Sequence, residues 1–172
     1  MTTTTSDRES GDSPFWNFSL EFYARPSVAR ACLELQDHAG VDVNVLLYLL
    51  FLAQQSRRLS RADVARIDGI ARTWRDRVVQ PLRTLRRDLK IGVAPFDVDT
   101  TAALRTDVKR IELEAERIEQ LALERLVHSS TTGTPATSRD EAARANLDAY
   151  GELLGAMPAA PTRLLLQVFA RQ

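Results

Sequence analysis

The chain has 172 residues, a length typical of a single domain, and 44% of them are hydrophobic, which is enough for a sizeable core. The 23 basic and 23 acidic residues cancel, so the bulk charge gives no attraction to nucleic acid or to an anionic membrane. The one cysteine, Cys32, cannot form an internal disulfide, and its helical spacing from Val28 and Leu35 indicates a small buried side chain.

The first thirteen residues, "MTTTTSDRESGDS", are polar and rich in threonine and serine. They have neither the basic start nor the apolar segment of a secretory signal. We expect residues 1–13 to be a disordered tail, residues 14–172 to form the domain, and the protein to be cytoplasmic.

The first helix is predicted from Pro14 to about Ala24, with Ser13 before it and proline at its first position. It carries nearly half of the aromatic residues of the chain. The favoured interpretation is an aromatic lid on the core. The alternative is an exposed strip for docking a partner, with Phe15, Trp16 and Tyr23 as candidates.

A second helix should run from Ser27 to His38, and Gly40 and Asp42 are suited to end it and to cap the next. The continuous apolar run, Val45 to Ala53, has nine residues and covers about half of a bilayer core of ~30 Å. It therefore predicts a buried central helix, from Asp42 to about Arg58, with the following leucines buried: Leu46, Leu47, Leu49, Leu50 and Leu52.

The polar turn "LQDHAGVD" raises the question of a metal site. We expect its polar side chains to satisfy helix ends and backbone groups instead; they are Gln36, Asp37, Asp42 and Asn44. His38 and His128 each fall near a predicted helix C-terminus, where the helix dipole favours a cation.

Ser60, with Asp63 three residues later, predicts the start of a long helix with a kink or break at Pro81. Its apolar positions follow steps of three and four: Val64, Ile67, Ile70, Trp74, Val78, Leu82, Leu85 and Leu89.

After the loop "IGVAPFDVD", another long helix is predicted from Thr100 to His128. Its expected apolar seam is Leu104, Val108, Ile111, Ala115, Ile118 and Ala122. A flexible linker at about 129–137, a helix from Ser138 to Leu154 and a short one at 162–169 should follow. The pattern predicts an all-α, single-domain bundle of about six to eight helices around the central apolar helix.

Each of the two long helices carries a charged stripe. The basic stripe of the first helix consists of Arg75, Arg83, Arg86, Arg87 and Lys90, and the acidic stripe of the second consists of Glu112, Glu116 and Glu119. We expect them to form interhelical ion pairs, because a surplus of four positive charges over 74–90 nearly cancels three negative ones over 107–124. The alternative is a basic groove for phosphate, nucleic acid or an acidic partner.

Motifs of known chemistry are absent from the sequence. It has no phosphate-binding glycine loop, no nucleophile elbow, no aspartate pair of the D-x-x-x-D kind and no Glu-x-x-His pair, and two histidines with one cysteine exclude ordinary zinc clusters. No cofactor is expected. The favoured function is an interaction or regulatory protein. The alternatives are an anion-binding module and an enzyme without a recognisable motif, and neither a partner nor an oligomeric state is defined.

Three blocks of sequence carry a resemblance to a known family: "FWNFSLEFYARPSVARACLELQDHAGVDVNVLLYLL", "WRDRVVQPLRTLRRDLK" and "KRIELEAERIEQLALERL". Together they resemble an uncharacterised proteobacterial family of small all-helical proteins, a domain of unknown function. The motifs that carry the resemblance are a Phe-Trp-x-Phe-Ser opening and a Leu-Gln-Asp-x-x-Gly-x-Asp-Val-Asn segment. The resemblance covers Pro14 to Leu126 and implies the helical fold, a bacterial origin and the cytoplasm, but no activity.

Overall fold

The computed structural model describes residues 13–127 and 131–172. The expected tail at 1–12, His128 and the first residues of the expected linker lie outside these ranges. The described elements, in chain order, are α1 (Pro14–Tyr23), α2 (Val28–Ala39), α3 (Val43–Gln54), β1 (Arg57–Arg58), α4 (Arg61–Trp74), a π-helical segment (Arg75–Val79), α5 (Gln80–Ile91), α6 (Val98–Leu126), β2 (Thr134–Pro135), α7 (Arg139–Leu154) and α8 (Ala159–Ala170). The predicted all-α, single-domain class is confirmed.

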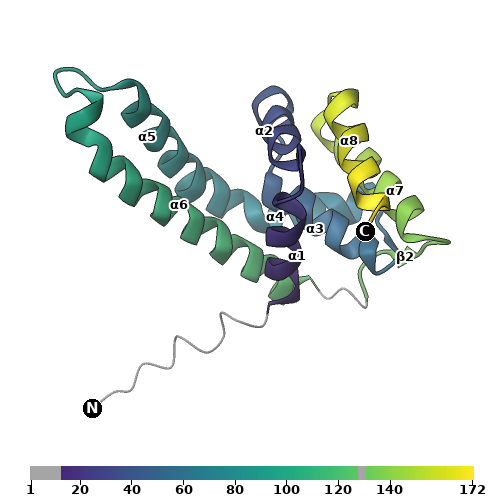
Figure 1. Cartoon of the computed structure of the whole chain (residues 1–172). Helices are drawn as coiled ribbons and strands as arrows, with labels where there is room; N and C mark the ends of the chain where they lie inside the picture. Colours follow the sequence, from purple (N-terminus) through teal and green to yellow (C-terminus); the bar gives the residue numbers. More distant parts are fainter. Residues whose placement is uncertain (1–12, 128–130) are drawn as a thin grey trace, which may run out of the picture.

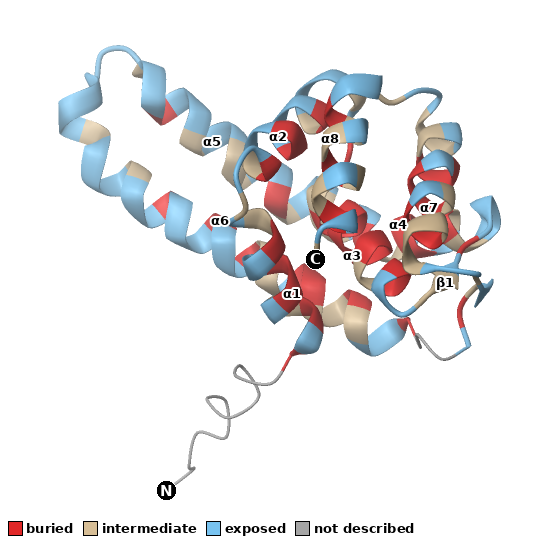
Figure 2. Cartoon of the chain, turned by 45° about the vertical axis from the view of Figure 1, so that its right-hand side comes forward, coloured by how far each residue is buried: buried red, intermediate tan, exposed pale blue. Residues whose placement is uncertain are grey.

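Helix α3 lies at the centre of the core, with α1, α4, α6 and α7 packed around it (Figure 2). Its five predicted core leucines are only 0–3% exposed, so the prediction of a central buried helix is confirmed. A helix that is apolar on every side has to be surrounded by others, and these helices together with α2 achieve this. No helix in the part of the chain that the structure describes has both the length and the apolar content that a membrane crossing requires.

The chain leaves α3 earlier than predicted. Helix α3 ends at Gln54, not Arg58, because Arg57 and Arg58 pair as strand β1 with the antiparallel strand β2. The Arg57 guanidinium donates to the carbonyls of Thr132 and Gly133, at 2.9 and 2.6 Å. Residues 131–137, expected as part of a flexible linker, are therefore tied to the end of the central helix. Gly133 has φ +70°, and a Cβ there would overlap the Arg58 carbonyl.

Helix α1 closes one side of the core with its aromatic residues. Phe15 is fully buried and meets the Tyr48 ring edge-on, with the ring centroids 4.7 Å apart. The docking role considered for Phe15 is therefore wrong, and the aromatic-lid interpretation holds for this residue. Ser13 caps the helix, and its hydroxyl and the Phe15 N–H both donate to the Glu124 carboxylate of α6, at 2.6 and 3.1 Å. This carboxylate complements the positive end of α1.

Helices α5 and α6 form an antiparallel hairpin whose outer half projects from the rest of the molecule (Figure 1). Helix α4 continues into α5 through the π-helical segment, in which Gln80 N–H donates to the Arg75 carbonyl five residues earlier. Pro81 lacks an N–H and disfavours regular α-helix in the turn before it, so the distortion lies there rather than at the proline itself. Within this segment Val79 is buried, where the apolar spacing placed Val78.

The predicted apolar seam of α6 is partly wrong. Val108 and Ala115 are buried as expected, but Leu104, Ile111 and Ile118 are 53%, 45% and 42% exposed. Beyond the globular part, α5 is the one described helix that covers α6, and a single neighbour buries a narrow stripe only. The buried side of α6 instead includes two carboxylates, Glu112 and Glu119.

Shortening a core leucine of α3 should destabilise the fold strongly. We expect Leu50→Ala, at a fully buried position, to lower the free energy of unfolding by about 2–5 kcal/mol, because it leaves a cavity. Urea unfolding monitored by circular dichroism measures this. The matched control is Leu126→Ala, since Leu126 is 60% exposed and its loss should cost less than about 1 kcal/mol. Equal effects at the two positions would contradict the central placement of α3.

Candidate functional site

A cavity of about 500 Å³ opens where the hairpin joins the globular part. Its walls are formed by residues of five helices, namely α1, α2, α3, α5 and α6. The lining residues are Trp16, Ser19, Leu20, Tyr23, Leu33, Gln36, Val43, Asn44, Leu47, Arg83, Arg86, Lys109, Glu112, Leu113, Glu116 and Gln120. The volume lies in the range of small-molecule sites, and the mixture of apolar walls with a few polar groups is typical of them.

The cavity brings together several residues that the sequence had singled out separately. Trp16 and Tyr23, the two remaining candidate docking aromatics, are half-buried and line it from α1. Arg83 and Arg86 line it from α5. Burial raises the pKa of the Tyr23 phenol, which Arg83 partly offsets. The aromatic strip and part of the charged stripes therefore belong to one site.

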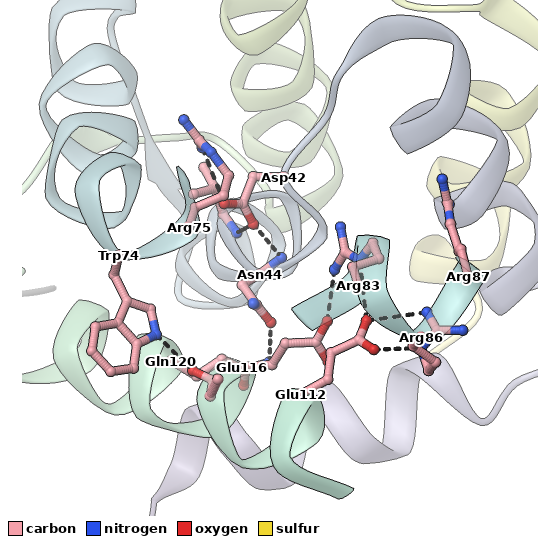
Figure 3. A network of polar contacts seen from close by, with 12 residues as sticks. Asp42, Asn44, Trp74, Arg75, Arg83, Arg86, Arg87, Glu112, Glu116 and Gln120 are labelled. Carbon is pink, nitrogen blue, oxygen red and sulfur yellow. Dashed lines mark hydrogen bonds and ion pairs between the residues drawn. The ribbon is translucent and has the colours of Figure 1, made fainter. Parts of the chain in front are cut away.

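The charged wall of the cavity is a network of ion pairs between α5 and α6 (Figure 3). Arg83 donates to Glu112 at 3.2 Å and to Glu116 at 2.7 Å. Arg86 donates to both oxygens of the same Glu112 carboxylate, one of them at 3.1 Å. These are the interhelical pairs that the charge balance predicts. Hydrogen bonding to Glu112 raises the pKa of Arg86, so this guanidinium stays charged throughout the physiological range.

Arg75 does not belong to this network, contrary to the predicted stripe. It donates to Asp42 at 3.0 Å and to Asp68 at 2.8 Å, and it also contacts Asp76. Burial alone would lower the pKa of Arg75, but the hydrogen bond that Arg75 donates to Asp68 and the charges of Asp42 and Asp68 outweigh it and raise this pKa. Arg75 is the first residue of the π-helical segment, and its ion pairs go to Asp42 at the start of α3 and to Asp68 of α4 and not to Glu112 or Glu116.

Arg87 and Lys90 also lie outside the network. Arg87 points away from Glu112 in Figure 3 and pairs with the exposed Asp37 of α2, at 2.8 Å. That pair also corrects the expectation that Asp37 satisfies a helix end. Lys90 is exposed on α5. Both side chains are exposed, although Arg87 lies only about 40° and Lys90 only about 20° around α5 from Arg83.

Glu119 is buried and forms no ion pair with Arg83, Arg86 or another described residue, although the stripe predicted a partner for it. Both of its carboxylate oxygens lack a hydrogen-bond partner within the described residues. Burial, and then the charge of the nearby Asp42, raise the pKa of Glu119 well above the ordinary range, which Asn44 and Arg75 only partly offset. Burial thus favours the protonated, neutral form of this side chain.

Two polar residues of the cavity wall escaped the sequence analysis. Gln120 donates from its amide nitrogen to Asn44 Oδ1 at 2.8 Å, yet its own oxygen, like the hydroxyl of Ser19, has no hydrogen-bond partner within the described residues. Helical spacing was the available signal. Ser19 lies three residues after Trp16 and four before Tyr23, and Gln120 lies four after Glu116, so each shares a helix face with residues already singled out.

Within the described ranges, no group of three or more histidine, cysteine, aspartate or glutamate side chains is arranged to hold a metal ion. Asp42, considered in the polar turn, accepts the N–H groups of Asn44 and Val45 as the cap of α3. His38 lies at the end of α2 and its Nδ1 is 2.9 Å from the Glu34 carbonyl. The thiol of Cys32 is buried, and burial raises its pKa to about 12, so it is a packing residue.

The fold and cavity define an all-helical, single-domain protein with a side pocket at the base of a projecting hairpin. A family model described as "Protein of unknown function (DUF2390)" matches residues 14–123, more than half of the chain. The chain belongs to this family. All residues that line the cavity lie within the matched part. No curated protein and no solved structure matches the chain.

The Arg83–Glu112 pair should show strong coupling. We expect Arg83→Met and Glu112→Gln each to destabilise the fold by about 2–4 kcal/mol, because each leaves a poorly solvated charge without its partner. In a double-mutant cycle the coupling should exceed about 1 kcal/mol. The exposed Glu114–Arg117 pair of α6 is the matched control, and its coupling should stay below about 0.5 kcal/mol. Coupling as weak as the control's would contradict a stabilising network.

Replacing Glu119 should change the dependence of stability on pH. In the folded protein its pKa is raised, so folding takes up a proton and stability falls as pH rises above the unfolded value of about 4.3. We expect Glu119→Gln to be about 1–3 kcal/mol more stable than wild type at pH 8, with a smaller difference at pH 5. Urea unfolding at the two pH values measures this. Glu114→Gln, at an exposed position of the same helix, should leave the pH dependence as it is.

Proposed function

We propose that the protein is a non-catalytic interaction protein whose projecting α5–α6 hairpin receives an amphipathic helix of another protein. The observation that carries the proposal is the exposed apolar stripe of α6. Leu104, Ile111 and Ile118 are spaced seven residues apart and are 42–53% exposed. Seven-residue spacing places the three side chains along one side of a helix, over about 21 Å.

The hairpin has the composition of a bundle that lacks one helix. Most of the exposed large apolar residues of the described chain lie on it or at its tip: Leu85, Ile91, Val93, Phe96, Val98, Leu104, Ile111, Leu113 and Ile118. Two helices bury one seam between them, and a third helix laid along the groove would cover the neighbouring stripes of both. Exposed apolar clusters of this kind mark interaction surfaces.

The charges favour this function over an anion-binding surface. Arg83 and Arg86 are already engaged by Glu112 and Glu116, and Arg87 by Asp37, so an anion would have to displace a carboxylate from each. The proposed interaction instead uses apolar residues that have no comparable partner among the described helices. We also propose a cytoplasmic location, which rests on a single cysteine that needs no oxidation for folding.

A photo-crosslinking amino acid in place of Ile111 tests the docking role in the native cell. We expect a crosslinked product with one other protein, at a helical segment with apolar residues at heptad spacing. Thr106 is the matched control position, because it is exposed and lies about 140° around α6 from Ile111. A crosslinker there should give at least about tenfold less of the same product.

A second experiment places the crosslinker at Leu104 and compares the product in the wild-type background with that in the double variant Ile111→Lys/Ile118→Lys. Both positions are half-exposed, so the fold should be retained while a helix can no longer dock on the stripe. The product should fall at least about tenfold. An unchanged product, or one made of two copies of this chain, would overturn the proposed partner.

A further inference from the structure

We propose that the cavity between α1 and the α5–α6 hairpin binds a small, uncharged aromatic molecule that carries one hydrogen-bond donor, N–H or O–H. This site is separate from the docking stripe. Glu112 and Glu116 face the cavity, whereas Ile111 precedes Glu112 by one residue and so lies about 100° around α6. The two proposals therefore stand or fall independently.

The walls of the cavity match an aromatic ring. Trp16 and Tyr23, one helical face of α1, lie on one side, and Leu33 and Leu47 of α2 and α3 contribute apolar surface. Leu20 is 51% exposed in the wall, a high value for a large apolar residue that faces a cavity. Aromatic and aliphatic side chains arranged around a volume of about 500 Å³ give a ring more contact than a flexible polar chain would find.

The charged groups of the wall argue for an uncharged ligand. Arg83 and Arg86 neutralise Glu112 and Glu116 through direct hydrogen bonds. A ligand with a net charge would enter next to a network that is already satisfied, and it would lose its own hydration without gaining a counter-ion. Lys109, the remaining charged residue of the lining, is exposed and keeps its hydration.

The polar groups of the wall set the hydrogen-bond character of the ligand. Gln120 is 4% exposed, and its oxygen is an acceptor that lacks a donor within the described residues, while its nitrogen is held by Asn44. Ser19 is 3% exposed, and its hydroxyl also lacks a partner there. The last torsion of a glutamine amide is broad, and rotation of a serine hydroxyl redirects its hydrogen and lone pairs, so both groups can adapt to a ligand at the wall. An N–H or O–H donor would satisfy the acceptor.

Two matched pairs of probe molecules test whether the ligand needs a hydrogen-bond donor: indole against 1-methylindole, and phenol against anisole. Within each pair the ring is retained and the donor is lost. The indole N–H signals of the two tryptophans in a ¹⁵N-labelled protein provide the readout. Trp16 lines the cavity, whereas Trp74 donates to the Ala115 carbonyl and does not line it, so its signal is an internal control.

We expect indole and phenol to shift the Trp16 signal in a saturable way, with dissociation constants on the order of 1 mM or below for ligands of this size. The methylated analogues should bind at least about tenfold more weakly, and the Trp74 signal should stay in place. Absence of a saturable shift at Trp16 would overturn the site. Equal affinities within each pair would overturn the donor requirement.

Three variants locate the binding. Leu20→Trp should fill the cavity and weaken indole binding at least about tenfold, while Leu126→Trp, at a 60% exposed position outside the lining, should leave it unchanged. Gln120→Leu should reduce the affinity for indole to that for 1-methylindole. Circular dichroism checks the fold of each variant, and the paired probes on the wild-type protein keep the test decisive if Gln120→Leu does not fold. Indole binding that is unaffected by Leu20→Trp would overturn the proposal.

Discussion

The pairing of Arg75 with Asp42 and Asp68 is the constraint on which the rest of the structure depends. Helix α3 is apolar on every side, so it has to begin inside the protein, where its first N–H groups cannot reach bulk water. Asp42 accepts two of them, and its charge is then balanced by Arg75, which also holds Asp68 of α4. Tyr150 of α7 accepts the Asp42 N–H. One buried carboxylate thus fixes the helices around the core.

The hairpin and the cavity follow from how α4 continues after this cluster. The π-helical segment begins at Arg75 and leads directly into α5, where Arg83 and Arg86 pair with Glu112 and Glu116 of α6. Their guanidinium groups draw the glutamates of α6 to the inner side and leave its isoleucines half-exposed outside. Helix α6 thus has a polar cavity wall on one side and an apolar stripe on another.

Local signals in the sequence predicted the fold well, and the site only in part. Caps at Ser13, Asp42, Ser60 and Ser138 depend on residues next to one another and were readable. Which side of a long helix is buried depends on how many neighbours cover it, and apolar spacing alone does not contain that number. This is why Leu104, Ile111 and Ile118 were assigned to the seam. Ser19 and Gln120 escaped because an unmet hydrogen bond is visible only in three dimensions.

The family match ends at residue 123, but the core does not. Asn146 of α7 is fully buried, and its amide donates to the Leu49 and Arg57 carbonyls and accepts the Leu59 N–H. A fragment limited to residues 14–123 would leave these backbone groups unsatisfied and one flank of α3 open to water. Family members whose chains lack a counterpart of α7 therefore have to shield the central helix in another way, either with a second chain or with more polar residues on that flank.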